Sequence, residues 1–117
     1  MKKIYIDFVK DIADSINDIE HFIGNMSFDE FLRDRKTINA VIRSLEIIGE
    51  AAKKIPSEIR DKNPLIPWKR MTGMRDKLIH EYFGVDLEIV WTVVKEELPP
   101  LKPKIMDIFT DLEKKQE

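Results

Sequence analysis

An arginine, a histidine, two acids and a tyrosine lie within eight residues in the C-terminal half of the chain: Arg75, Asp76, His80, Glu81 and Tyr82. Histidine titrates closest to neutral pH, so it can serve as a general acid or a general base. Arginine carries a rigid fork of N–H donors that fits phosphate oxygens. The residue types in this segment therefore suit acid–base chemistry beside a phosphate group.

The spacing of these residues limits how one helix could present them. Asp76 and His80 are four apart and share a helical face, so Asp76 could set the tautomer and orientation of the imidazole. Arg75 and His80 differ by about 140° around an ideal helix, so one straight helix does not aim both at the same atom. A long arginine reaching around the helix, a distorted helix end before Gly84, or a second copy of the chain could each bring the two groups together.

A second copy would also supply a second imidazole, which allows one histidine to act as base and the other as acid. We therefore predict a two-fold homodimer in which both copies of the segment line one cleft.

Positive charge is concentrated just before this segment. Residues 60–77 contain six basic residues and two acidic ones, whereas the whole chain has 20 Lys and Arg against 22 Asp and Glu. A net charge of -2 excludes a protein that coats nucleic acid by bulk charge, so any contact with RNA must be local. A solvated surface is the ordinary interpretation of such a run. The alternative is an RNA-binding surface that includes Lys69, Arg70 and Lys77.

A polar stripe earlier in the chain is a second candidate surface. Asn39, Arg43, Glu46 and Glu50 are spaced at i, i+4, i+7 and i+11, beside an apolar stripe. One interpretation is an exposed helical face with favourable charge pairs. The other is that Arg43 assists phosphate binding while Glu46 or Glu50 holds a basic group in place.

Two long helices are predicted in the N-terminal half. Isoleucines and a phenylalanine recur every three or four residues from Ile4 to Ile23, which indicates a helix over about residues 3–23. Ser27 and Glu30 have the spacing of a capping box, in which each side chain accepts from the other residue's amide. We expect a second helix to begin there and to continue without interruption to Pro56, about 27 residues long.

The C-terminal half is also predicted to be helical. A connector with one helical turn at residues 57–60 leads to a third helix, from about Pro67 or Trp68 to Phe83. Asp86 can cap a fourth helix, and Pro99 and Pro100 must break or restart it because neither can donate an amide. A last helix follows to about Leu112. The pattern indicates one domain, residues 1–117, folded as an all-α, antiparallel bundle of four to five helices.

Composition excludes several classes of protein. The chain has no cysteine, which removes disulfides, thiolate metal sites and cysteine nucleophiles. No run of apolar residues is long enough to span a membrane. The basic N-terminus meets an acid at Asp7, so we do not expect secretion and predict a cytoplasmic protein. We expect no bound metal and no organic cofactor.

The segment from Arg75 to Tyr82 resembles the R-xxxx-H-x-Y signature of HEPN domains, a helical superfamily of ribonucleases. The surrounding sequence resembles the HepT branch of that superfamily. It includes R-S-L-E-I-I-G-E-A-A at residues 43–52, Trp68, the stretch 74–86 and E-L-P-P-L at residues 97–101. The resemblance covers nearly the whole chain.

This resemblance implies a function and a partner. HepT proteins are toxins of two-gene toxin–antitoxin modules, and a small MNT-type nucleotidyltransferase neutralises them by transferring AMP to the motif tyrosine. It implies RNA cleavage by a homodimer, with tRNA as the favoured substrate class. Arg75 and His80 would be the catalytic pair, Asp76 would support them, and Tyr82 would be the AMP acceptor. The alternative is a non-catalytic module that binds nucleotide or RNA and docks a nucleotidyltransferase, with His80 as a structural histidine.

Overall fold

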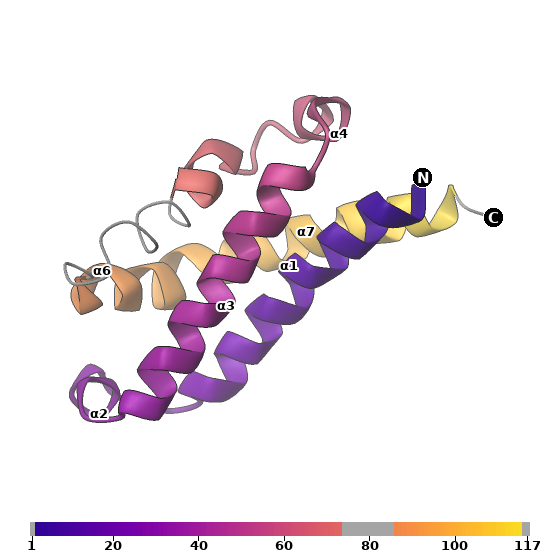
Figure 1. Ribbon diagram of the computed structural model, residues 1–117. Coiled ribbons are helices and arrows are strands. Elements are labelled where there is room, and N and C mark those ends of the chain that lie inside the picture. The colour runs from indigo at the N-terminus through magenta and orange to yellow at the C-terminus, as the bar shows by residue number, and fades with distance from the viewer. Residues whose placement is uncertain (1, 74–85, 116–117) are drawn as a thin grey trace.

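A computed structural model describes residues 2–73 and 86–115, and every regular element in these residues is helical (Figure 1). The all-α prediction is confirmed. Within this part of the chain, no helix is both long enough and apolar enough to cross a membrane. The elements are α1 (Lys2–Ile23), α2 (Phe28–Leu32), α3 (Arg35–Lys54), α4 (Ser57–Lys62), α6 (Leu87–Thr92), the π-helical segment η2 (Val93–Glu97) and α7 (Leu98–Lys114).

The helices α1, α3 and α7 form the body of the fold. Figure 1 shows α3 running back along α1, and α7 returning across the bundle so that the start of α1 and the end of α7 lie close together. The predicted apolar face of α1 is buried, with Ile12, Ile16 and Ile19 fully inaccessible to solvent. Val41 and Leu45 of α3 and Ile105 of α7 belong to the same core. The core therefore lies where these three amphipathic helices meet.

The predicted end of α1 and the capping box are both confirmed. Gly24 has φ of 51°, the left-handed conformation that ends a helix and that glycine adopts without steric cost. The Glu30 amide donates to Ser27 Oγ at 3.2 Å, and the Ser27 amide donates to Glu30 Oε1 at 3.0 Å. The backbone hydrogen bond from Ser27 lowers the pKa of the Glu30 carboxyl below its ordinary value, because it favours the charged form.

The prediction of one uninterrupted helix from Ser27 to Pro56 is wrong, because the chain leaves the helix between Leu32 and Arg35. Asp34 caps the new helix: its Oδ1 accepts a hydrogen bond from the Thr37 amide at 3.0 Å. The break separates α2 from α3, and α2 buries Phe31 completely, with its ring 5.1 Å from that of Trp91. Apolar periodicity could not reveal this break, because Phe31 and Leu32 fit the spacing of either arrangement.

Pro99 and Pro100 lie at the start of α7, and no loop separates α7 from the helical segments before it. Asp86 caps α6 as predicted, since its side chain accepts from the Glu88 and Ile89 amides. The helical path then passes through η2, where the Leu98 amide reaches back to the Val93 carbonyl. Pro99 and Pro100 fall in the first turn of α7, the position at which a helix best tolerates a residue without an N–H.

The connector after α3 is partly helical, and both tryptophans pack in or against the core. The predicted turn at residues 57–60 is part of α4, and residues 68–73 are helical, as expected from Trp68 onward. Trp68 is 8% exposed, and its Nε1 donates to the Asn63 carbonyl at 3.1 Å. Trp91 is half-buried against the rings of Phe28 and Phe31.

Candidate functional site

Five of the predicted site residues lie outside the described residues: Arg75, Asp76, Lys77, His80 and Tyr82. Their roles therefore stay predictions. What the structure describes is the part of the fold on either side of them, together with Arg43, Lys69 and Arg70.

Both flanks of this segment are attached to the core. On the N-terminal side, Trp68 and Met71 are buried on the helical stretch 68–73. On the C-terminal side, Asp86 Oδ1 accepts from the Glu88 amide at 2.9 Å, and Val90 is buried one turn later. The hydrogen-bonded cap fixes where α6 begins. The chain therefore enters and leaves the candidate motif from fixed positions.

An open hollow of about 410 Å³ lies on α3, next to the start of α6. Tyr82 precedes Leu87 by five positions, and that length of chain spans at most about 18 Å. The hollow is therefore within reach of the candidate motif. Its lining combines two cations, an amide, an acid and apolar side chains, namely Arg35, Ile38, Asn39, Ile42, Arg43, Glu46 and Leu87.

The polar stripe predicted on α3 forms one side of this hollow. Arg43 Nη1 lies 3.3 Å from Glu46 Oε2, and the Arg43 side chain is 62% exposed against 22% for Glu46. Glu46 therefore holds a basic group, and that group is Arg43. The guanidinium still has N–H donors facing solvent, which a phosphate could accept. Asn39 is exposed beside it, and Glu50 continues the stripe beyond the hollow.

The basic run before the motif divides into residues with different surroundings. Arg70 Nη2 lies 2.8 Å from Glu97 Oε2 of η2, so part of its charge is already neutralised. Lys69 is exposed and makes no ion pair within residues 2–73 and 86–115. Lys62 lies 3.9 Å from Glu58 on its own helix. Among the described members of the run, Lys69 is the cation that is most available to a ligand.

Arg60, also in the basic run, has a structural role that sequence reasoning missed. Its guanidinium donates to the carbonyls of Ile55, Lys53 and Ala52, at 2.8, 2.9 and 3.2 Å. These carbonyls belong to the end of α3, where the last turn has no helical donors. A basic residue shortly after a helix end, near a proline that stops the helix, was the available signal.

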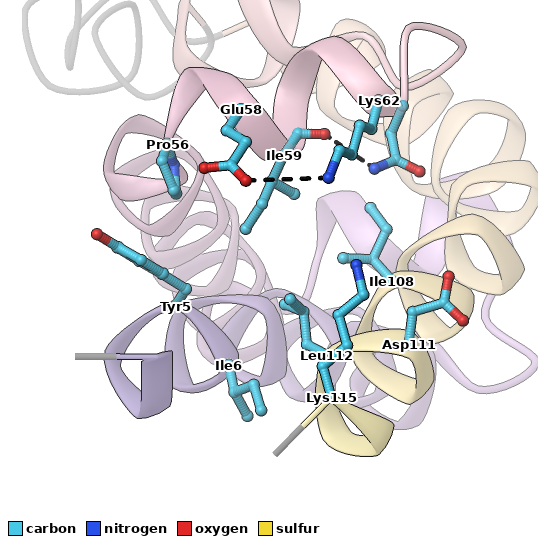
Figure 2. A pocket seen from close by; sticks show the side chains of 11 residues that line it. Tyr5, Ile6, Pro56, Glu58, Ile59, Lys62, Ile108, Asp111, Leu112 and Lys115 are labelled. Carbon is cyan, nitrogen blue, oxygen red and sulfur yellow. Dashed lines mark hydrogen bonds and ion pairs between the residues drawn. The ribbon is translucent and has the colours of Figure 1, made fainter. Parts of the chain in front are cut away.

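A second pocket, of about 300 Å³, lies between the start of α1, α4 and the end of α7 (Figure 2). Ile59, Ile108 and Leu112 line its apolar part, while Lys62 and Lys115 are at its rim. It lies at the opposite end of α7 from α6, and none of the site residues that the structure describes (Arg43, Lys69 and Arg70) lines it. Of these two, only the hollow on α3 has a lining residue, Leu87, within a few positions of the candidate motif in the sequence.

Comparisons with known proteins agree with the motif. The model of the family described as "Ribonuclease HepT-like" matches residues 12–108. A protein of Thermococcus cleftensis named "Probable ribonuclease HepT" is 53% identical over 104 residues, which is 89% of this chain and 94% of that protein. Two proteins of Methanocaldococcus jannaschii, each named "Putative RNase", are 47% identical over 116 residues and 49% identical over 110 residues.

These alignments cover 99% of this chain and 96% of the relative in the first case, and 94% and 91% in the second. No solved structure matches the chain. The family match includes α3 with its hollow and the whole segment from Arg75 to Tyr82. This chain therefore belongs to the HepT-like ribonuclease family.

Proposed function

We propose that this protein is a metal-independent endoribonuclease and the toxin of a toxin–antitoxin module. The observation that carries the proposal is the intact Arg75-x4-His80-x-Tyr82 motif inside the region matched by the family of HepT-like ribonucleases. The names of the relatives support the ribonuclease activity. The toxin role, the preference for cellular RNA such as tRNA and the cytoplasmic location rest on the resemblance alone.

The proposed reaction uses the 2′-hydroxyl of RNA as its nucleophile. His80 of one protomer takes the proton from that hydroxyl, and the 2′-oxygen forms a bond to the adjacent phosphorus. The bond from phosphorus to the 5′-oxygen breaks, and His80 of the partner subunit protonates the leaving oxygen. Arg75 donates to the phosphate oxygens as their charge develops, and Asp76 holds the imidazole in the required tautomer. The products are a 2′,3′-cyclic phosphate and a 5′-hydroxyl end.

RNA binding is assigned to a small number of cations, because the chain as a whole is slightly acidic. Arg43 lies at the hollow on α3, and Lys69 and Arg70 precede the motif by one helical stretch. Together with Lys77, they would bind the phosphates that flank the cleaved bond. Few phosphate contacts give a shallow dependence of affinity on salt concentration, so we expect a smaller slope than for a protein that coats nucleic acid.

The proposed partner is an MNT-type nucleotidyltransferase that transfers AMP to Tyr82. Tyr82 is two residues from His80 in the sequence, so its modification adds a bulky nucleoside and a negative phosphate close to the catalytic group. That charge would repel the phosphates of an RNA substrate. Modification of one tyrosine would therefore be sufficient to inhibit the enzyme.

The experiment that tests this function uses protein expressed without a nucleotidyltransferase, with an unmodified Tyr82 verified by intact mass. The protein is incubated with total RNA in the presence of a chelator, beside the His80→Ala variant. We expect the parent to cleave RNA and His80→Ala to be inactive with an unchanged circular dichroism spectrum. Cleavage that persists in His80→Ala contradicts the assignment. Absence of cleavage in both proteins favours the non-catalytic docking module.

His21→Ala provides a matched control, since the chain has two histidines. His21 is exposed near the end of α1, and its Nδ1–H donates to the Asn17 carbonyl of the same helix at 2.8 Å. It has no contact with the hollow on α3. We expect His21→Ala to cleave RNA as fast as the parent, which separates loss of a catalytic imidazole from loss of any imidazole.

A further inference from the structure

The short helix α4 is only lightly packed against the rest of the fold. None of its residues is buried, and its one apolar residue, Ile59, is half-buried against the core. The pocket of about 300 Å³ separates α4 from the start of α1 and the end of α7 (Figure 2). We call this space the α4 pocket. Because one water takes about 30 Å³ of liquid, the α4 pocket has room for a ligand of about ten non-hydrogen atoms.

The inner part of the α4 pocket is apolar. Ile59 of α4 lies on one side of the space, and Ile108 and Leu112 of α7 lie on the other (Figure 2). Ile6 of α1 adds a fourth aliphatic side chain. Ile59 and Leu112 are half-buried, so each keeps part of its apolar surface in contact with water. A ligand with an apolar body would remove that surface from water, which favours binding.

Two lysines and two acids surround this apolar part. Figure 2 shows the side chains of Lys62 and Lys115 extending into the opening between α4 and α7, whereas the carboxylates of Glu58 and Asp111 lie to either side. The rim is neutral overall, but its cations are the charged groups directed into the opening. An anionic group at this position would therefore meet the N–H donors of two ammonium groups.

Both ammonium groups are available to such a ligand. Lys62 Nζ lies 3.9 Å from Glu58 Oε1, and the two side chains are 64% and 80% exposed. An ion pair this long and this exposed contributes little, so a ligand can replace it at small cost. Lys115 is exposed and has no ionic partner among the residues that the structure describes.

We propose that the α4 pocket binds a small carboxylate with an apolar body, of the size of a medium-chain fatty acid. The aliphatic chain packs between Ile59 and Leu112, and the carboxylate binds Lys62 and Lys115. A cationic ligand would place its charge against the same ammonium groups, and a ligand that is polar throughout would leave groups unpaired against the apolar side chains. The inference goes beyond the proposed function and does not depend on it, because the α4 pocket and the hollow on α3 share no lining residue.

A series of ligands tests the chemistry of the pocket by isothermal titration calorimetry. Octanoate should bind the full chain with a dissociation constant below about 1 mM, within the range for a ligand of about ten non-hydrogen atoms. From butanoate to octanoate the affinity should rise by about threefold per added CH₂, and it should level off for longer chains once the pocket is full. Octylammonium, which has a similar length and the opposite charge, should bind at least about tenfold more weakly than octanoate.

Two results of this series would overturn the proposal. If octylammonium binds as tightly as octanoate, the two lysines do not select the ligand. If the affinity keeps rising with chain length beyond octanoate, below the micelle concentration, the ligand adsorbs to apolar surface in general. Absence of octanoate binding to the folded parent would refute the site directly.

Substitutions at the rim test the assigned contacts. Lys62→Gln and Lys115→Gln should each weaken octanoate binding at least about fivefold, because each removes one charged donor. Glu58→Gln should strengthen binding, since it removes the acid that competes for Lys62. Lys114→Gln is the matched control, because it makes the same change one position before Lys115 at a residue that does not line the pocket. All four side chains are exposed, and circular dichroism verifies that each variant is folded.

NMR of the backbone amides locates the ligand. Octanoate should shift the signals of Ile59, Lys62 and Leu112 and leave that of Ile42, in the hollow on α3, unchanged. Shifts that are spread over the whole chain, or binding that is equal in the parent and in Lys62→Gln with Lys115→Gln, would show adventitious binding only and refute the proposal. None of these measurements uses RNA, so a failure of the proposed function leaves their outcome unchanged.

Discussion

Replacing Arg60 with alanine should destabilise the fold without weakening RNA binding, although Arg60 begins the basic run. Its guanidinium donates to the Ile55 carbonyl at 2.8 Å, the Lys53 carbonyl at 2.9 Å and the Ala52 carbonyl at 3.2 Å. The end of α3 itself supplies the Ala52 carbonyl with one donor, the Ile55 amide at 3.3 Å, but the other two carbonyls have no helical donor. In the Arg60→Ala variant all three carbonyls lose the guanidinium as a donor, and the turn between α3 and α4 loses the group that holds it.

The size of the effect follows from the exposure of each bond. The bonds to the Ile55 and Ala52 carbonyls are partly buried, and a net hydrogen bond of this kind contributes about 1 kcal/mol. The bond to the Lys53 carbonyl is exposed, so water can replace it at little cost. We therefore expect Arg60→Ala to lower the free energy of unfolding by about 2 kcal/mol. At this chain length, that corresponds to a fall of about 8 °C in Tm.

Urea denaturation followed at 222 nm, at one fixed protein concentration, measures this loss. Arg60→Lys keeps the positive charge but lacks the forked N–H donors of the guanidinium, so it should recover about half of the lost stability. Arg70→Ala is the control for simple removal of a surface cation, since its ion pair with Glu97 is largely exposed and should contribute less than about 1 kcal/mol. The reasoning is refuted if Arg60→Ala unfolds like the parent while its affinity for RNA falls.

Three further predictions concern the termini and contacts of the helices. Gly24→Ala should lower the free energy of unfolding by about 1 kcal/mol in urea titrations, because φ of 51° is strained for a side chain with a Cβ. Trp91→Ala should lower the free energy of unfolding by about 3 kcal/mol in the same assay, because it removes the α6 ring that packs against Phe28 and Phe31 of α2. A variant as stable as the parent would show that other contacts hold α2. The Glu30 carboxyl, whose pKa is lowered in the fold, should contribute stability that is present above its unfolded pKa and is lost as pH falls through its folded pKa. In Glu30→Gln this part of the acid-induced loss should disappear, and an unchanged pH profile would contradict it.

The spacing of apolar residues correctly predicted the buried face of a helix such as α1, which packs one side against the core. The isoleucines of α1 are buried as their spacing predicts, and the capping box at Ser27 and the cap at Asp86 are both formed. Each of these features depends on residues within about one helical turn, so it is encoded locally. The family assignment was predicted from the same kind of signal, the Arg75 to Tyr82 motif, and the comparisons confirm it.

Features that depend on distant residues could not be predicted in this way. The break at Asp34 accompanies the packing of Phe31 against Trp91, about 60 residues later in the sequence. The continuous path into α7 includes η2, a turn widened to a π-helix just before the prolines, which propensity alone does not specify. The role of Arg60 at the end of α3 required the chain to turn back on itself, and local charge counting only placed this residue in a basic run whose ordinary interpretation is a solvated surface.

The sequence alone determined that the protein is all-α, where α1, α6 and the capping box begin, and which family it belongs to, because these depend on short-range spacing and on a contiguous motif. The tertiary structure decided how the basic residues are used. Arg60 caps the end of α3 from the following helix, and Arg70 pairs with Glu97, 27 residues later in the sequence. The reason is physical: the partner of a charged side chain is set by which helices pack together, and this information is spread over the whole chain.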